Sequence, residues 1–466
     1  MITTMLFLSL QFFTPQTATA EPWVSNRFAQ NCAGCHAPGR FNRPPIGRRC
    51  TLSCQGCHVN PNGGGMRNKY GVWNDKRWLK SMHSDTLRND HAPAPYKYQK
   101  YKKVAGRKTK RVYNLNVIKK LNPPEKFYDK HHDKNWLKEV PTLSQYLSTI
   151  PYEDPYRQER RESIQASGDL RYLYGKVSGD SDKDLNFLMN VDLGIRLRPI
   201  KEKLSFVFEH RYLNNPNNTE LESVFTTESR VRSAYVLVDD LAYNTYAMAG
   251  LYRPMFGNYT PDHTSLSQQI SGLDQRAVYK GIGFGAAPNV PFFTFNYLMP
   301  MQNTNYSQDE GFVFTGGGRF VTLGASATIS HWNTEKDSTS VPGLKVKKEM
   351  TAIALGTALF NSTLILNGEL LNFSIQDDNA NTNSGTVMTF EGKYKVWRES
   401  YLTGEIANSN TAVDTTKGSA TSYAVGYKIF LVPGVELDVK HAIYNTERQG
   451  SKLDYNTTFL QAHLYF

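Results

Sequence analysis

Long hydrophobic runs are missing from most of this 466-residue sequence. Beyond the first 20 residues, no stretch approaches the roughly 20 consecutive apolar residues that a membrane-spanning helix needs. This absence excludes a helical membrane protein, so any passage of the mature chain through a membrane must be made by β-strands. The low mean hydropathy of -0.51 is compatible with strands, because a membrane barrel exposes only every second residue to lipid.

Cysteine is also scarce, and four of the five cysteines lie in two pentads, Cys32-Ala33-Gly34-Cys35-His36 and Cys54-Gln55-Gly56-Cys57-His58. Two thiols at this spacing reach the two vinyl groups of one porphyrin, and the adjacent imidazole binds the iron. The pentads predict two covalently bound c-type haems with proximal ligands His36 and His58. The alternative is a structural zinc site in which the four thiols share one tetrahedral metal.

The fifth cysteine, Cys50, has no partner for an internal disulfide and is best read as a small packed thiol, with axial ligation or an intermolecular link as alternatives. Histidine or methionine would serve as a distal haem ligand. We favour His83 and His91, because paired imidazoles are common where haems transfer electrons without binding a small ligand. Other candidates within reach in sequence are Met66, Met82, His131 and His132. Guanidinium groups match haem propionates, for which the nearby candidates are Arg48, Arg49 and Arg67.

The first residues have the pattern of an export signal. A short apolar core spans residues 5–13, and Ala18-Thr19-Ala20 is a small-residue cleavage site before Glu21. No Lys or Arg precedes the apolar core, which departs from the usual signal. We nevertheless expect a signal peptide over residues 1–20, because c-type haem attachment requires export.

Charge divides the mature chain into two parts. Residues 21–165 hold 28 Lys and Arg against 12 Asp and Glu, whereas residues 166–466 hold 26 against 30. We predict a dihaem segment over 21–92 and a basic linker rich in Pro, Lys and Tyr over 93–162. The linker could offset haem propionates, steer an acidic redox partner or form a solvated tether. No nucleic-acid partner is expected, because an exported protein has little access to one.

The second part alternates between apolar and polar residues, which is the pattern of strands with one apolar face. In residues 164–174, Ile164, Leu170 and Tyr172 fall on one face and Asp169 and Arg171 on the other. Residues 435–443 repeat the pattern. We predict sixteen strands beginning near residues 164, 185, 203, 230, 242, 275, 290, 311, 320, 346, 363, 386, 400, 420, 435 and 454.

The breaks between these strands predict the class of β-protein. Those after even-numbered strands are very short, and those after odd-numbered strands are longer and polar. An even strand count with short turns at one end is typical of outer-membrane barrels, whose turns face the periplasm. The fold class is therefore mainly β, a 16-strand outer-membrane barrel over 163–466 preceded by a small loop-rich and partly helical dihaem segment. A soluble all-β domain is the alternative.

Two further features fit a barrel of this class. The chain ends on alternating Leu460, Ala462, Leu464 and Phe466, which resembles the insertion signal of outer-membrane barrel proteins. The longest break, Pro254 to Leu273, lies where a loop folds into the lumen of the general bacterial porins. If that likeness holds, Met255, Asp262 and His263 line a constriction or face an electron donor. The alternative is an ordinary surface loop.

Together, the pentads, the barrel and the terminal Phe466 resemble the fused cytochrome-porins of bacteria that exchange electrons with extracellular iron. The resemblance implies electron transfer across the outer membrane between periplasmic redox carriers and an extracellular donor or acceptor, with outer-membrane lipid around the barrel. The chain departs from the iron-oxidising members by having two haem motifs and a long basic segment. Alternatives are a solute porin with a periplasmic haem domain that docks redox partners, and a dihaem enzyme such as a peroxidase.

Overall fold

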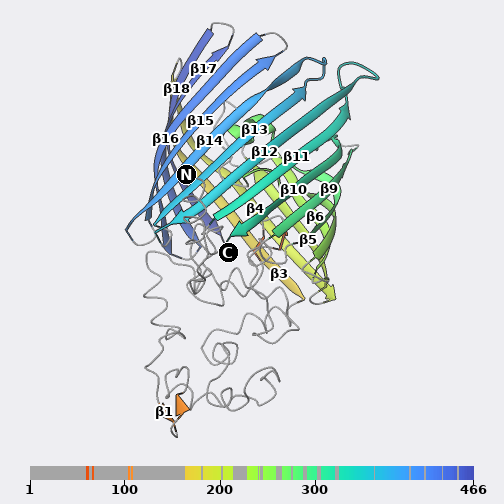
Figure 1. Ribbon diagram of the computed structural model, residues 1–466, viewed down its shortest axis with the longest axis vertical. Coiled ribbons are helices and arrows are strands. Elements are labelled where there is room, and N and C mark those ends of the chain that lie inside the picture. Colours follow the sequence, from red (N-terminus) through yellow and green to blue (C-terminus); the bar gives the residue numbers. More distant parts are fainter. Residues whose placement is uncertain are drawn as a thin grey trace, which may run out of the picture.

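A computed structural model describes the barrel and a few residues that precede it (Figure 1). The described residues are 59–61, 66–67, 103–104, 107–108, 163–179, 182–200, 203–213, 228–239, 241, 245–258, 265–273, 277–286, 291–301, 306–320, 325–360, 363–397, 400–413, 416–432, 434–448 and 451–465. Two short strands, β1 (Lys103–Val104) and β2 (Arg107–Lys108), pair with each other.

Sixteen antiparallel strands form one closed barrel in which each strand pairs with its sequence neighbours and β18 pairs with β3. The strands are β3 (Ile164–Ser178), β4 (Lys183–Ile200), β5 (Leu204–Leu213), β6 (Glu228–Val238), β7 (Thr245–Tyr252), β8 (Tyr279–Ala286), β9 (Pro291–Met299), β10 (Glu310–Phe320), β11 (Ala325–Asp337), β12 (Lys345–Leu359), β13 (Leu364–Gln376), β14 (Thr382–Trp397), β15 (Ser400–Val413), β16 (Thr416–Val432), β17 (Val435–Arg448) and β18 (Ser451–Tyr465). Closure removes the unpaired edges that an open sheet would present. The predicted strand number is confirmed.

The predicted strand starts are all within five residues of the observed ones. The connections after β4, β8, β10, β12, β14 and β16 are short, as expected, and define the turn end of the barrel. At the opposite end, the connections 214–227, 253–278 and 300–309 are long. The expectation of long loops fails for β3–β4, β15–β16 and β17–β18, whose strands are separated only by residues 179–182, 414–415 and 449–450.

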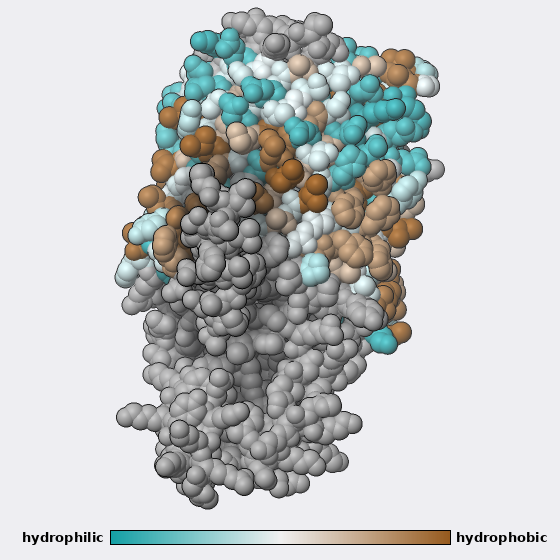
Figure 2. Space-filling model, viewed as in Figure 1, coloured by the Kyte–Doolittle hydropathy of each residue, from teal (hydrophilic) through white to brown (hydrophobic). Residues whose placement is uncertain are grey.

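Alternation places large apolar side chains on the outside of the barrel. Exposed apolar residues occur on most strands, among them Ile164, Phe208, Ile353, Met388 and Leu464. Figure 2 shows hydrophobic residues gathered over the middle and lower part of the visible barrel face, with hydrophilic residues above them. An outward apolar band flanked by polar surface is the arrangement that a lipid bilayer requires of a barrel.

The connection between β7 and β8 folds against the inner wall and carries the helix α9 (Leu266–Ser271). Leu266 and Ile270 of this helix pack against an apolar cluster that includes Trp332 and Phe256. The cluster lies on inward positions of the strands, so the porin-like inward loop is confirmed for the described residues 253–258 and 265–273. We call 253–278 the inward loop. No helix among the described residues is long and apolar enough to cross a membrane.

The outward apolar face yields a first prediction. Ile353 of β12 is 46% exposed, whereas its neighbour Ala352 is fully buried on the inner face. We expect Ile353→Arg to destabilise the barrel in lipid vesicles by about 2–4 kcal/mol, because a charge near the bilayer midplane loses its hydration. Urea unfolding in vesicles measures this loss, with Ile353→Val as the control. Equal stability of the two variants would mean that this face does not meet lipid.

Candidate functional site

The described residues after the second Cys-x-x-Cys-His pentad, 59–61 and 66–67, lie inside the barrel near its turn end. Val59 and Met66 are each 3% exposed and share an apolar cluster with inward side chains of β5, β6 and β7. The Val59 N–H donates to the Met66 carbonyl oxygen at 3.0 Å, which joins the two described parts of this stretch. We call residues 59–67 the lumen segment. Its described residues are 59–61 and 66–67.

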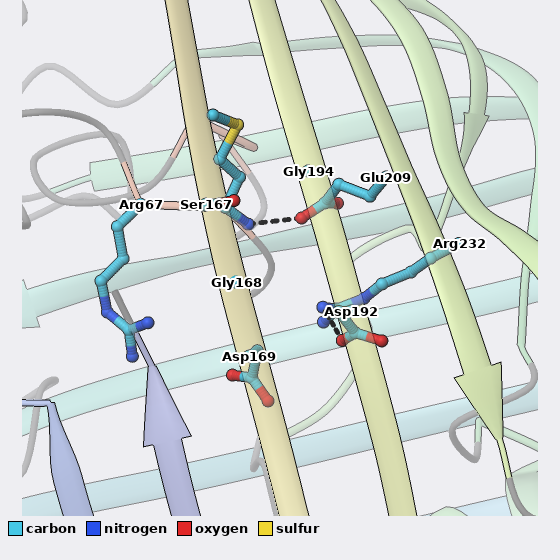
Figure 3. Close-up of a pocket in the computed structure, with 9 residues that line it drawn as sticks. Arg67, Ser167, Gly168, Asp169, Asp192, Gly194, Glu209 and Arg232 are labelled. Atoms are coloured by element: carbon cyan, nitrogen blue, oxygen red, sulfur yellow. Dashed lines mark hydrogen bonds and ion pairs between the residues drawn. The ribbon is translucent and has the colours of Figure 1, made fainter.

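The lumen segment is anchored to the barrel wall by its backbone. The Met66 N–H donates to Glu209 Oε1 at 2.6 Å (Figure 3). The buried Ser233 hydroxyl donates to the other carboxylate oxygen of Glu209. A hydrogen bond to a buried carboxylate contributes about 1.5–3 kcal/mol, more than a bond between neutral groups. Glu209 is therefore the strongest single anchor among the described contacts of the segment.

Arg67 ties the segment to the seam where the barrel closes. Its carbonyl oxygen accepts a hydrogen bond from Gln165 Nε2 of β3 at 2.7 Å. Its guanidinium lies 3.7 Å from the ring centroid of Tyr465 of β18, within the range of a cation–π contact. The same residue thus contacts the first and the last strand of the barrel. Arg67 was one of three candidates for pairing with a haem propionate, and that role stays a prediction.

The wall beside the lumen segment is rich in arginine. Asp192 accepts hydrogen bonds at 2.5 Å from both Arg211 and Arg232, which lie on neighbouring strands. Three carboxylates on this wall (Asp169, Asp192 and Glu209) face six arginines. These arginines on β3–β6 are Arg171, Arg196, Arg198, Arg211, Arg230 and Arg232. The wall therefore has a positive balance that suits anionic groups.

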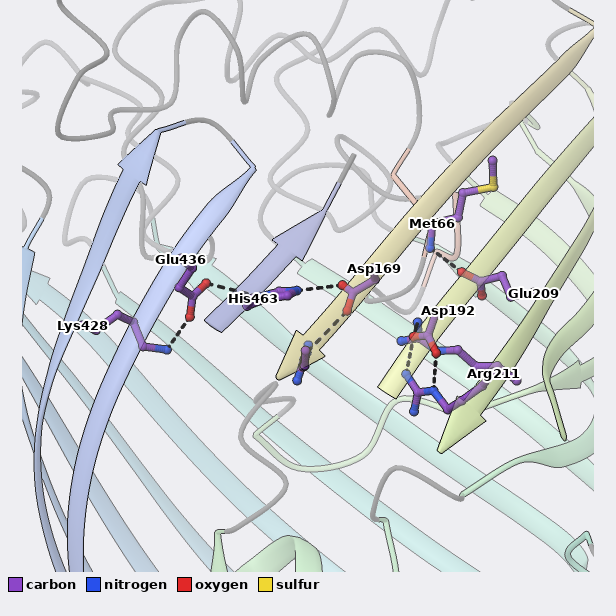
Figure 4. A network of polar contacts seen from close by, with 10 residues as sticks. Met66, Asp169, Asp192, Glu209, Arg211, Lys428, Glu436 and His463 are labelled. Carbon is purple, nitrogen blue, oxygen red and sulfur yellow. Dashed lines mark hydrogen bonds and ion pairs between the residues drawn. The ribbon is translucent and has the colours of Figure 1, made fainter. Parts of the chain in front are cut away.

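A second polar network crosses the seam (Figure 4). His463 Nε2 lies 2.8 Å from Asp169 Oδ2, and its Nδ1 lies 3.6 Å from Glu436 Oε2. Glu436 in turn accepts a hydrogen bond from Lys428 Nζ at 2.8 Å. These residues come from β3, β16, β17 and β18, so the network links both sides of the closure. Sequence reasoning missed this network, although Asp169 was predicted to lie on the polar face of its strand.

An aromatic surface lies next to this polar wall. Tyr235, Tyr246 and Tyr252 are buried in the same cluster as Val59 and Met248. Tyr252 donates its hydroxyl hydrogen to Asn296 Oδ1 at 3.0 Å. The described surroundings of Val59 therefore combine an apolar aromatic face with an arginine-rich one. That chemistry suits an amphipathic group with a flat apolar body and carboxylates.

Most site residues predicted from the sequence lie outside the described residues. These are Cys32, Cys35, His36, Cys54, Cys57, His58, His83 and His91, together with Cys50, Asp262 and His263. Met66 is described and packs in the apolar cluster around Val59. Among the described residues there is no group of three or more His, Cys, Asp or Glu side chains that could hold a metal ion.

The inward loop is fixed to the barrel wall by its backbone. The Gly257 N–H donates to Ser330 Oγ at 2.9 Å, and the Asn258 N–H donates to Glu369 Oε1 at 2.7 Å. The Met255 carbonyl accepts from the Thr315 hydroxyl at 2.7 Å. Met255 thus lies in the inward loop rather than in an ordinary surface loop. The loop packs against the central cluster around Trp332.

No protein-family model matches the sequence, and no curated protein is significantly similar to it. Solved structures are similar in fold. Outer-membrane expressed OmpT of Vibrio cholerae is 10% identical, with 65% of this chain and 97% of that chain covered and a TM-score of 0.50. Salmonella typhi OmpF in complex with daunomycin is 12% identical, with 65% and 97% covered and a TM-score of 0.50. The fold is thus similar to that of outer-membrane porins.

The anchor of the lumen segment can be tested at one amide. We expect Glu209→Ala to speed hydrogen exchange at the Met66 amide roughly 10- to 100-fold, because the amide loses a charged acceptor. The control is Glu405→Ala, which removes another lumen carboxylate, bonded to Lys440 at 2.9 Å. An unchanged exchange rate in Glu209→Ala would contradict the anchoring role.

Gly257 offers a test of the inward loop. Its φ of +59° favours glycine, and an added Cβ would lie 2.0 Å from Glu369 Oε1. Gly343 has a φ of +77° and nothing within 4 Å of an added Cβ. In both variants, placing alanine at a positive φ costs about 1–2 kcal/mol of folding free energy. We expect thermal unfolding to show a larger loss of folding stability for Gly257→Ala than for Gly343→Ala. Equal losses of stability would refute the tight contact with Glu369.

Proposed function

We propose that this barrel lies in the bacterial outer membrane and carries electrons across it through haem held by the N-terminal segment. In this proposal, the haems exchange electrons with periplasmic carriers at the turn end and with an extracellular donor or acceptor, such as iron, at the other. The barrel's outward apolar band and its likeness to outer-membrane porins support the location. The two pentads support the cofactor.

One observation carries the proposal beyond the sequence. Val59, which directly follows His58, is buried inside the barrel wall rather than on its outside. Consecutive Cα atoms are about 3.8 Å apart, so chain connectivity favours a second haem close to the lumen. A haem held outside the pore would leave most of the membrane thickness to be crossed without a cofactor. Placement at the lumen shortens the distance that electrons must travel.

The residues around Val59 suit a c-type haem. The tyrosines of the apolar cluster match the porphyrin body, and Arg230 and Arg232 on the adjoining wall match its propionates. Cys54 and Cys57 would hold the second haem, with His58 on its iron, and Cys32, Cys35 and His36 would hold the first. When bound, the haem iron supplies one-electron redox chemistry. The protein's own part is to fix the haem segment in the lumen and to exclude lipid from it.

A second candidate is a passive solute porin whose haem segment docks redox partners. The porin-like barrel and the inward loop favour it, because both features belong to a channel for solutes. The polar lumen is compatible with either function. The two candidates differ in whether electrons cross a membrane when no solute carries them.

Proteoliposomes separate the candidates. Vesicles containing trapped ferricyanide are mixed with an external reduced cytochrome that is too large for the lumen. We expect the protein to oxidise the external cytochrome, whereas a Cys54→Ser, Cys57→Ser double variant should oxidise it much more slowly. Sugar-driven vesicle swelling is measured on both proteins as a check on barrel insertion and solute passage.

Equal oxidation rates in the two proteins would contradict electron transfer through the haems. If the double variant oxidises the cytochrome as fast as the native protein, ferricyanide has leaked through an open pore and the solute porin is correct. A pyridine haemochrome assay on the same samples should give two haems per native chain and one in the variant. A native chain without haem would overturn the electron-transfer proposal outright.

A further inference from the structure

We propose that a second copy of this chain covers the outward face of β8, β9 and β10, so that two barrels pair side by side in the membrane about a two-fold axis. This inference goes beyond the proposed function and does not depend on haem. We call the outward side chains of these three strands the aromatic face. Its members are Lys280, Ile282, Phe284, Phe293, Phe295, Tyr297, Glu310, Phe312 and Phe314.

The barrel wall is lowest at this face. Among the barrel strands that the structure describes, only β7, β8 and β9 have fewer than ten residues, with 8, 8 and 9. Eight residues that rise about 3.4 Å each along a strand tilted by about 45° span about 19 Å, whereas the apolar band of an outer-membrane barrel is about 25 Å tall. Lipid can cover such a low wall only by becoming thinner, whereas a second low wall matches it in height.

The side chains of the aromatic face also differ from those of the taller walls. Six of its seven large apolar residues are aromatic, and these six are 37–44% exposed. Phe295 pairs across the strands with Phe284 on one side and Phe314 on the other, so a row of phenylalanines crosses the middle of the face. By contrast, the exposed large apolar residues described on β12, β15, β17 and β18 are all aliphatic. Aromatic residues are enriched at protein interfaces, whereas the aromatic girdles of lipid-facing barrels lie at the edges of the apolar band.

A single low wall requires a self-complementary contact. Both barrels insert into the membrane in the same direction, so a two-fold axis that relates them runs along the membrane normal. An axis that passes in front of β9 brings Phe295 against Phe295 of the partner subunit. The same axis places β8 of one chain opposite β10 of the other.

The two charges of the aromatic face complement each other under this symmetry. Lys280 on β8 is exposed and Glu310 begins β10, so the two residues flank β9 near the loop end. Lys280 then lies on the same side as Glu310 of the partner subunit, and the pair occurs twice in the dimer. Strand tilt offsets the two positions by about 7 Å in height, which the two long side chains can span.

Charge exchange tests this pairing. Native mass spectrometry of the detergent-extracted full chain should find two chains in one complex. Lys280→Glu or Glu310→Lys alone should raise the dissociation constant of the complex about tenfold, because two attractive contacts become repulsive. The double variant Lys280→Glu, Glu310→Lys should restore the native value. The control is Lys347→Glu, which reverses an exposed charge on β12 and should leave the complex unchanged.

A cysteine at the axis provides a second test, in intact membranes. In a Cys50→Ser background, a short bismaleimide reagent should join Phe295→Cys chains into a product of twice the chain mass. Phe390→Cys on β14, where Phe390 is 50% exposed, should stay monomeric.

Four results would overturn the proposed dimer. These are a native complex of one chain or of three, a complex with a different protein, a double variant that stays as weak as the single ones, and no crosslinking from position 295. None of these readouts depends on haem, so the electron-transfer proposal would stand or fall separately.

Discussion

Backbone hydrogen bonding in a membrane is the constraint on which the rest of this structure depends. A strand that meets lipid must pair all its N–H and C=O groups with other strands, because the hydrocarbon offers no partner. The chain meets this requirement by pairing β18 with β3, from Asn456 with Ser178 to Tyr465 with Asp169. Closure makes an inside and an outside, and the alternation of side chains then assigns apolar residues to the outside. The charged side chains of the central strand positions, such as Asp192, Glu209 and Arg211, are directed into the lumen.

The lumen therefore concentrates charge, and the structure arranges it in linked pairs. Asp192 is shared by Arg211 and Arg232, while His463 connects Asp169 with Glu436 across the seam. Buried charges are tolerated only when they are paired and hydrogen-bonded. These pairs also give the lumen segment its binding surface, since Met66 and Arg67 lie among them. The same wall therefore closes the barrel and anchors the lumen segment.

The sequence predicts the barrel well because period-two alternation is a local signal. Strand number, strand starts and the facing of residues such as Ile164 and Asp169 follow from it. Three connections predicted to be long are short, because composition does not show how far a strand continues beyond the lipid band. The insertion of residues 59–61 and 66–67 was not predictable. It depends on contacts such as Met66 with Glu209, 143 positions apart, and no local pattern encodes them. The haem residues themselves stay predictions from the motif.

The central claim is that the chain behind the second haem motif occupies the barrel interior, and photocrosslinking in intact cells tests it directly. The photoreactive amino acid p-benzoylphenylalanine would replace Val207, which shares the cluster with Val59 and Met66. The outward neighbour Phe206, which is 44% exposed, provides the control position. Mass spectrometry should find crosslinks from position 207 to residues 59–67 and none from position 206. Crosslinks from 207 to barrel strands alone would contradict the account.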